Sequence, residues 1–205
     1  MANLSDLRRE VRLHASQCPD TTIDYALIRA MREFCRETWY YQASVYINQV
    51  TGTGTYIISP SDGSEVISIE AVDLEVDSKL YPVTQTEASK SDGTVIGFQF
   101  EPPSYLIILP VPTTTVTNGI EARLVLMPPE NTTTIPDSIY RNFKETIVAG
   151  ALGFILSMQA DSWSNPQLAA MKIQEFHIGM WRAKGDRKRD FRPGAIRVSS
   201  RPFLI

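Results

Sequence analysis

The hydrophobic period of this chain switches twice along its length, and few folds can accommodate such a sequence. Up to residue 44, apolar residues recur every three or four positions, as in amphipathic helices. From Val45 to about residue 130 they alternate, and helical spacing returns near Pro136. Periods of 3.6 and 2 belong to helices and strands respectively. The sequence therefore predicts two helices, a β-rich insertion and two further helices.

Residues 1–44 predict two amphipathic helices. The first begins near Asn3 or Ser5 and ends before the Cys-Pro-Asp turn at 18–20. In the second helix we expect Thr21 and Asp24 to cap the first free amide groups. The predicted buried face of this second helix consists of Ile23, Leu27, Ala30, Phe34 and Thr38.

Residues 45–134 form the predicted β-rich insertion. Alternating runs are separated by turn segments such as SPSDGS and PTTTVTNG, and Asp-Gly pairs tolerate the positive φ of tight hairpins. The alternation shifts near Ala71 and Val72, which predicts a β-bulge. We expect an antiparallel β-sandwich or barrel of about six or seven strands.

Residues 135–187 predict the two C-terminal helices. The stretch 137–158 is apolar on nearly every side, as in a helix covered by its neighbours, and its glycines Gly150 and Gly153 allow close helix approach. Asn165 fits the N-cap of the last helix and Pro166 its first turn. Both pairs of helices have apolar faces, so we expect them to pack together.

The predicted fold class is therefore α+β. A small four-helix unit, made from residues 1–44 and 135–187, carries the inserted β-sandwich or barrel at 45–134, and residues 188–205 form an extended basic arm. A chain of 205 residues with 43% hydrophobic content can bury such a core.

Charge is distributed unevenly along the chain. Residues 51–140 hold twelve acids against three bases, a balance of −9. Residues 181–205 hold eight bases against two acids, a balance of +6, in a chain of net charge −3. An acidic middle and a basic end are separate signals, and they predict different neighbours for the two regions.

The basic end finishes with AIRVSSRPFLI, in which apolar and polar residues alternate before a Phe-Leu-Ile terminus. Disordered tails seldom carry strand patterning, so we interpret this arm as an edge strand with apolar anchors that completes another chain. A solvated basic terminus and a nucleic-acid-binding tail are the alternatives. The arm residues expected to bind are Phe191, Arg192, Ile196, Arg197, Val198, Arg201, Phe203, Leu204 and Ile205.

The sequence contains no catalytic signature. The glycine-rich loop at 52–55 lacks the Lys-Ser/Thr of a phosphate-binding loop and leads into a strand. Two histidines and two cysteines complete neither a nucleophile–base arrangement nor a metal-ligand set. We therefore expect a protein that is not an enzyme and uses no metal or cofactor.

The order of elements and several sequence segments resemble the head-to-tail adaptor (connector) proteins of tailed bacteriophages. The likeness rests on LSDLRREVRLHASQCPD, REFCRETW, IPDSIYRNFKETIVAGALGFILSM, WSNPQLAAMKIQEF and the Arg-rich end. It spans most of the chain and is weakest at residues 45–130.

This resemblance implies a structural protein of the virion neck, assembled in the host cytoplasm. Identical subunits would form a ring, expected to be dodecameric, that docks under the portal protein and continues the DNA channel to a tail tube or nozzle protein. Genomic DNA would pass through without sequence-specific binding. The arm would hold the portal or a neighbouring subunit.

The resemblance also suggests roles for two further sets of residues. Close packing within and between subunits would involve Phe143, Ile147, Gly150, Gly153 and Phe154. Acids that line the channel or face the tail would be Glu70, Asp73, Glu75 and Asp77. Negative side chains there would repel phosphates and keep DNA sliding.

Two other functions compete with the adaptor. A tail-associated cell-wall hydrolase would use Glu70, Asp73 or Glu75 as acid and base, and a monomeric β-sandwich would recognise a host glycan or protein. The apolar run 146–158 is too short to cross a bilayer, and the N-terminus lacks the apolar run of a signal peptide. We therefore expect no membrane partner.

Overall fold

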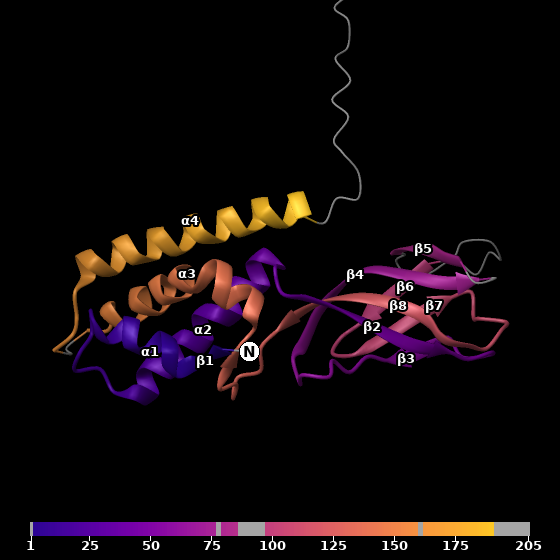
Figure 1. The fold of residues 1–205 in the computed structure, drawn as a ribbon, viewed down its shortest axis with the longest axis horizontal. Coiled ribbons are helices and arrows are strands. Elements are labelled where there is room, and N and C mark those ends of the chain that lie inside the picture. Colours follow the sequence, from indigo (N-terminus) through magenta and orange to yellow (C-terminus); the bar gives the residue numbers. More distant parts are fainter. Residues whose placement is uncertain (1, 77–78, 86–96, 160–161, 191–205) are drawn as a thin grey trace, which may run out of the picture.

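Helices and strands separate into two parts of the molecule that lie end to end (Figure 1). The computed structural model describes residues 2–76, 79–85, 97–159 and 162–190. Within these residues, four helices and mainly antiparallel sheets form a mixed α+β structure, as predicted. The helices gather in one part, and strands β2 to β8 form the other.

The two N-terminal helices are α1 (Leu4–Arg12) and α2 (Asp20–Thr38). The expected cap of Thr21 and Asp24 is wrong, because α2 begins earlier and Pro19 occupies its N-cap position without a side-chain hydrogen bond. Asp24 instead accepts two hydrogen bonds from Arg8 of α1, at 2.5 and 2.6 Å. A paired guanidinium is a stronger partner for a carboxylate than a neutral amide group.

The C-terminal helices are α3 (Asp137–Leu156) and α4 (Pro166–Asp190). The predicted N-cap of α4 is confirmed, since the Leu168 amide donates to Asn165 Oδ1 at 3.1 Å. The predicted start of the arm at residue 188 is wrong, because α4 continues through Asp190. Lys and Arg are good helix formers and favour the negative end of the helix dipole, so this basic run extends the helix.

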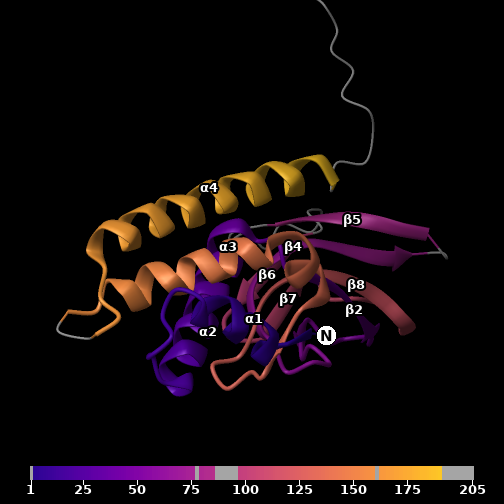
Figure 2. The same cartoon turned by 60° about the vertical axis from the view of Figure 1, so that its left-hand side comes forward.

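All four helices contribute to one buried core. Figure 2 shows α3 lying beneath α4 and alongside the N-terminal helices. A β-carbon at Gly150 would lie 2.8 Å from Phe176 of α4 and 3.0 Å from Ala30 of α2, so α3 approaches both helices closely. Buried residues of α1 and α2 therefore lie in the same cluster as buried residues of α3 and α4.

The larger sheet has seven strands in the order β2-β8-β4-β5-β6-β7-β3, and β1 pairs with β9 in a separate two-stranded sheet. All pairs are antiparallel except β5 with β6. The chain enters this part through β2 and leaves through β8, where Gln42 and Val125 are direct partners. The strands are β1 Ala2–Asn3, β2 Gln42–Gln49, β3 Thr55–Ile57, β4 Glu65–Val76, β5 Lys79–Gln85, β6 Gly97–Glu101, β7 Tyr105–Leu109, β8 Val116–Met127 and β9 Thr134–Ile135.

The seven-stranded sheet has its own buried core. Strands from both ends of the strand order contribute to it, for example Leu106 of β7 and Leu124 of β8. The described strands do not close into a barrel, because β2 and β3 remain at the two ends of the order. Of the two architectures expected for this part, the barrel is therefore not formed by the strands that are described.

Strand β4 contains two register shifts against β8. One lies between Ile69 and Ala71, next to the predicted bulge, and the other lies between Val66 and Ser68. Each shift leaves one residue without a direct partner and changes the side on which the following residues lie. As a result Ile67 packs against the helical core, whereas Ile69 belongs to the core of the sheet.

Two glycines of α4 provide a test of how tightly the helices pack. A β-carbon at Gly179 would lie 2.2 Å from Thr146 Oγ1, whereas one at Gly185 would meet nothing within 4 Å. Gly179→Ala is expected to lower the free energy of unfolding by about 1–3 kcal/mol through overpacking. Gly185→Ala, its matched control, is expected to raise it by up to about 1 kcal/mol through helix propensity. Urea unfolding measures both changes, and equal effects would contradict the packing.

Candidate interaction surfaces

The helical part is joined to the sheet at strand β4 and the turn before it. Arg32 of α2 donates to both carboxylate oxygens of Glu65, at 2.8 and 3.1 Å. The same guanidinium donates to the carbonyl of Pro128 at 2.7 Å. Ile67, two positions after Glu65 on β4, packs on the helical core. We call these contacts of Glu65 and Ile67, together with those of Asp62 and Glu70 described next, the junction.

Tyr41 occupies the point where the chain passes from α2 into β2. Its ring packs against both buried cores, and its hydroxyl donates to Asp62. Burial, reinforced by this hydrogen bond, raises the pKa of Tyr41 to about 12. Burial alone would raise the pKa of Asp62, but hydrogen bonds from Tyr41 and Ser64 outweigh it, and that pKa is lowered. The carboxylate form of Asp62 therefore supports the junction.

Arg187, in the last two turns of α4, joins this helix to the same strand. Its Nη2 lies 2.5 Å from Glu70 Oε1, and the two side chains are only 22% and 23% exposed. The guanidinium also lies over the ring of Trp39, 5.1 Å from its centroid, and Trp39 ends α2 with φ of 55°. Lys184 adds an ion pair with Glu37 at 3.0 Å. The end of α4 is thus held on both α2 and β4.

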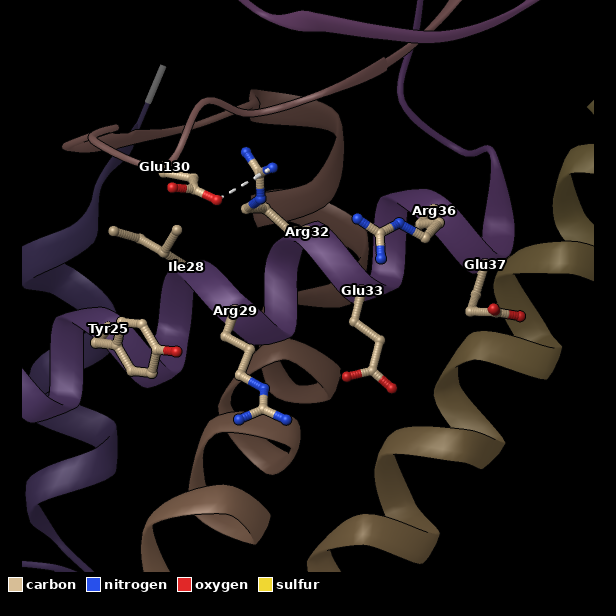
Figure 3. Close-up of a pocket in the computed structure, with 8 residues that line it drawn as sticks. All are labelled: Tyr25, Ile28, Arg29, Arg32, Glu33, Arg36, Glu37 and Glu130. Carbon is tan, nitrogen blue, oxygen red and sulfur yellow. Dashed lines mark ion pairs between the residues drawn. The ribbon is translucent and has the colours of Figure 1, made fainter.

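An open groove of about 610 Å³ follows the exposed side of α2 (Figure 3). Tyr25 and Ile28 supply its apolar surface near the N-terminal end of the helix, and Glu33 lies further along. The complete lining is Tyr25, Ile28, Arg29, Arg32, Glu33, Arg36, Glu37 and Glu130. Its volume is within the range of roughly 300–1,000 Å³ that is common for binding sites.

Most charges in this groove already have partners within the chain. Arg32 is occupied by Glu65 and lies 3.7 Å from Glu130. Arg29 lies over the ring of Phe154, 4.4 Å from its centroid, and Glu37 pairs with Lys184. Within the part of the chain that the structure describes, Glu33 forms no ion pair. Glu33 is therefore the acid of the groove that is available to another molecule.

The outer side of α4 exposes a row of large apolar side chains. Met171, Ile178 and Trp181 are 60%, 60% and 77% exposed. At 100° per residue they lie opposite Phe176 and Met180, which are buried in the helical core. We call Met171, Ile178, Trp181 and the exposed Arg182 next to them the α4 stripe. Met171 and Ile178 are seven positions apart, with the exposed Gln174 and Glu175 between them.

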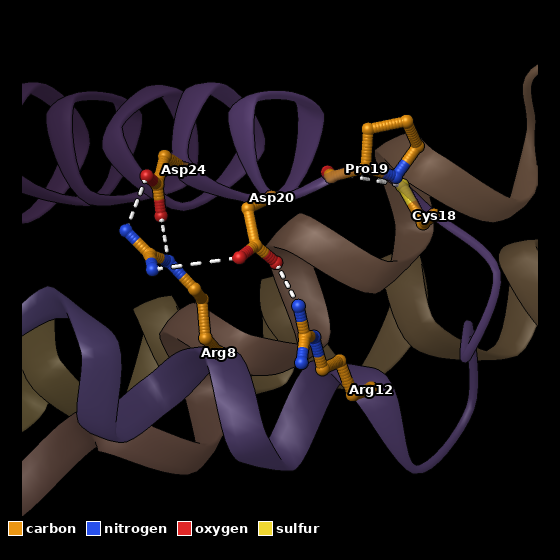
Figure 4. A network of polar contacts seen from close by, with 6 residues as sticks. All are labelled: Arg8, Arg12, Cys18, Pro19, Asp20 and Asp24. Atoms are coloured by element: carbon orange, nitrogen blue, oxygen red, sulfur yellow. Dashed lines mark hydrogen bonds and ion pairs between the residues drawn. The ribbon is translucent and has the colours of Figure 1, made fainter.

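A second polar cluster fixes the two N-terminal helices to each other (Figure 4). Arg8 of α1 binds Asp24 and lies 3.7 Å from Asp20, which also pairs with Arg12. The hydrogen bond with Asp24 raises the pKa of the Arg8 guanidinium further. This cluster is saturated within the chain, so we assign it to stability rather than to binding.

The four acids expected to face the channel or the tail have different surroundings. Glu70 pairs with Arg187, which gives it a structural role. Asp73 is half-buried on β4 and lies directly across from Glu121 of β8. Glu75 pairs with Leu80 in the backbone ladder, and Asp77 lies outside the described residues.

The residues expected to pack subunits are used within one chain. Phe143 and Ile147 are buried in the helical core, Gly150 faces Phe176, and Gly153 faces Ile173. Phe154 is half-buried, with its ring 5.9 Å from that of Tyr25 at the edge of the groove. A role between subunits stays a prediction for these residues.

The expected arm lies outside the described residues, from Phe191 to Ile205. Sequence reasoning missed the groove, the α4 stripe and Arg187. The stripe was visible in principle, because Met171, Ile178 and Trp181 share a face that the predicted core did not need. The pairing of Arg187 with Glu70 joins positions 117 residues apart and leaves no local pattern.

The described residues contain no group of three or more His, Cys, Asp or Glu that could hold a metal ion. Within the same residues, no helix combines the length and apolar content needed to cross a membrane. Neither a scan of protein-family models nor a search of curated proteins finds a match for this chain.

The ion pair of Glu70 with Arg187 is expected to couple α4 to the sheet. Glu70→Gln or Arg187→Gln should each lower the free energy of unfolding by about 1–3 kcal/mol, because each leaves a largely buried charge without its partner. The double variant should lose less than the sum, with a coupling of about 1 kcal/mol or more. The pair Lys172–Glu175 within α4, in which Glu175 is 50% exposed, is the control, with a coupling below about 0.5 kcal/mol. Equal couplings in urea unfolding would contradict a special role for Arg187.

The lowered pKa of Asp62 predicts how the junction responds to acid. A depressed carboxylate pKa contributes stability above its unfolded value, and this contribution disappears as pH falls through the folded pKa. Asp62→Asn should therefore be less stable than the unaltered protein at pH 7 by up to about 1 kcal/mol. Urea unfolding across a pH series measures the difference. It should shrink below the ordinary value of 3.8, and a difference that persists in acid would contradict the assignment.

Proposed function

We propose that this protein is a structural adaptor of the neck of a tailed bacteriophage. Its subunits form a ring, dodecameric in our proposal, between the portal and the tail tube or nozzle, and the ring extends the DNA channel. In this view the fold is a four-helix unit that carries an inserted β-sandwich. The sequence resemblance motivates the proposal, and features of the structure support it.

The observation that carries the proposal is that α4 extends beyond the helical core and is held there by ion pairs. Ala183 is the last described residue of α4 in the helical core, yet the helix continues to Asp190, about two turns further. This extension is held by Arg187 on β4 and Lys184 on α2. A helix anchored to its end, and followed directly by a basic and apolar segment, suits a subunit that presents this segment to a partner. Repeated around a ring, weak single contacts become a strong attachment.

The acidic middle of the chain supports a role beside DNA. Asp73 and Glu121 lie directly opposite each other on neighbouring strands, although like charges at such positions destabilise a sheet. Their sequence neighbours Val72, Leu74, Ile120 and Ala122 point into the core of the sheet, so the two acids belong to its other face. Two neighbouring acids that the fold does not require suit a wall along which DNA slides.

Removal of residues 191–205 tests the proposal. The truncated protein should no longer sediment with purified portal rings, and it should keep its urea unfolding midpoint, because we assign this segment to attachment rather than to the core. A full-length Leu13→Ser variant is the control, since Leu13 is 81% exposed on the helical part and should not affect portal binding. Retention of the truncated protein on portal rings would refute the proposed attachment.

A further inference from the structure

We propose that strand β2 of one subunit receives the segment 195–201 of a second copy of this chain as an added strand. The inference rests on the proposed ring and names a contact through which neighbouring subunits meet. It starts from the open edge of β2, which the structure describes, and from the length and pattern of the chain that follows α4.

Strand β2 is an edge strand with free backbone groups. Within the described residues it pairs only with β8, and the register is regular over residues 42–47. The Leu126 amide donates to the Tyr41 carbonyl, and such hydrogen-bonded pairs alternate along an antiparallel ladder. The amide and carbonyl groups of Ser44 and Tyr46 therefore point away from β8, where another strand can bind them.

The residues of β2 do not protect this edge against pairing. Edge strands are commonly protected by charged side chains, by Pro or by being very short. β2 has eight residues, and none of them is charged or Pro. The opposite edge of the sheet is β3, which has only three residues and lies between Gly54 and Pro60. The fold therefore shortens one edge of the sheet and leaves the other open.

The core of the sheet is also incomplete beside β2. Val45 and Ile47 pack on the buried core of the sheet but are only half-buried, whereas their partners Ala122 and Ile120 on β8 are 0% exposed. A further strand with apolar residues at alternate positions would cover them. The occupant that satisfies both the backbone groups and these side chains is an extended polypeptide segment.

The chain itself supplies a segment of this kind. Residues 195–201, with the sequence AIRVSSR, are bounded by Pro193 and Pro202, and Pro ends a strand because it has no amide hydrogen. Ile196 and Val198 alternate with polar residues, over a length that matches the regular part of β2. The last three residues of the chain lie beyond this segment and remain for the portal.

Charge favours a segment of this composition. The segment belongs to a region with a balance of +6, and the sheet to one with a balance of −9. On the outer face beside β2, two acids, Glu121 and Asp73, outnumber one base, Arg123. None of the three forms an ion pair within the part of the chain that the structure describes. A basic segment is therefore attracted to this side of the sheet.

The contact joins two different surfaces, so it is head-to-tail. Such heterologous contacts repeat from copy to copy and produce a ring when the rotation closes. Because the proposed ring needs a contact of this type, we assign the segment to the next copy. Pairing of β2 with β2 of another copy would be two-fold, and pairing within one chain would produce no association, so experiments separate all three.

Sedimentation velocity of the full-length protein, up to about 1 mM, measures the association. The unaltered protein should associate with increasing concentration. Ser44→Lys should weaken association by about tenfold, because a Lys on an edge strand discourages pairing. Thr55→Lys, which places the same charge at an exposed position of β3, is the matched control and should have no effect. Absence of self-association, or equal effects of the two variants, would overturn the proposal.

Changes in the segment test its assignment as the occupant. Val198→Pro in the full-length protein should weaken association by about tenfold, because the variant loses a backbone donor within the added strand. Phe203→Ala, beyond Pro202, should leave association unchanged. Unchanged association of Val198→Pro would overturn this inference even if the protein still sediments with portal rings. Association that responds as expected, without portal binding, would refute only the adaptor function.

Cross-linking of full-length variants decides the polarity. Ser44→Cys lies on β2 and Ser199→Cys in the segment, while the natural Cys18 and Cys35 are buried. A short bis-maleimide should join one variant to the other and form few dimers of either alone. Predominant Ser44→Cys dimers would show a two-fold contact. A double variant that cross-links but stays monomeric would show pairing within one chain, and either result would overturn the inference.

Discussion

The double use of strand β4 is the constraint on which the structure depends. In a regular strand Ile67 and Ile69 would lie on the same face, because side chains alternate with a period of 2. Here they belong to two different cores, and the register shift between Val66 and Ser68 makes this possible. The shift near Glu70 lies at the residue that meets Arg187. One strand can therefore complete the sheet and hold the helical part at the same time.

The sequence predicts those features of the fold that depend on neighbouring residues better than those that depend on residues far apart in the chain. Periodicity located the helices and strands, the Asn165 cap and the bulge of β4, because each depends on neighbouring residues. The glycines of α3 were correctly expected to allow close helix approach, although their partners lie in the same chain. The cap expected from Thr21 and Asp24 failed because α2 begins at Asp20, and Asp24 binds Arg8, sixteen positions away.

The candidate surfaces show the same division between local and distant information. The charge balances of −9 and +6 describe regions correctly but do not assign individual side chains. Glu70 from the acidic region and Arg187 from the basic region neutralise each other, so neither is available to a partner. Trp181 and Glu33 could not be identified from charge balance, because their interest lies in being exposed and unpaired in the folded protein. That property emerges only after the helices are packed.

Gln42 and Val125 are direct partners on β2 and β8, and this affects how freely the sequence of the β part can vary during evolution. The chain leaves the helical part at β2 and returns from β8 at an adjacent point. Residues between Gln42 and Val125 therefore form an insertion whose two ends lie side by side. Its length and loops could diverge during evolution without moving the helices, provided that the first half of β4 is retained. Recombination between related genes could therefore exchange this insertion as a unit, with crossovers near Gln42 and Val125.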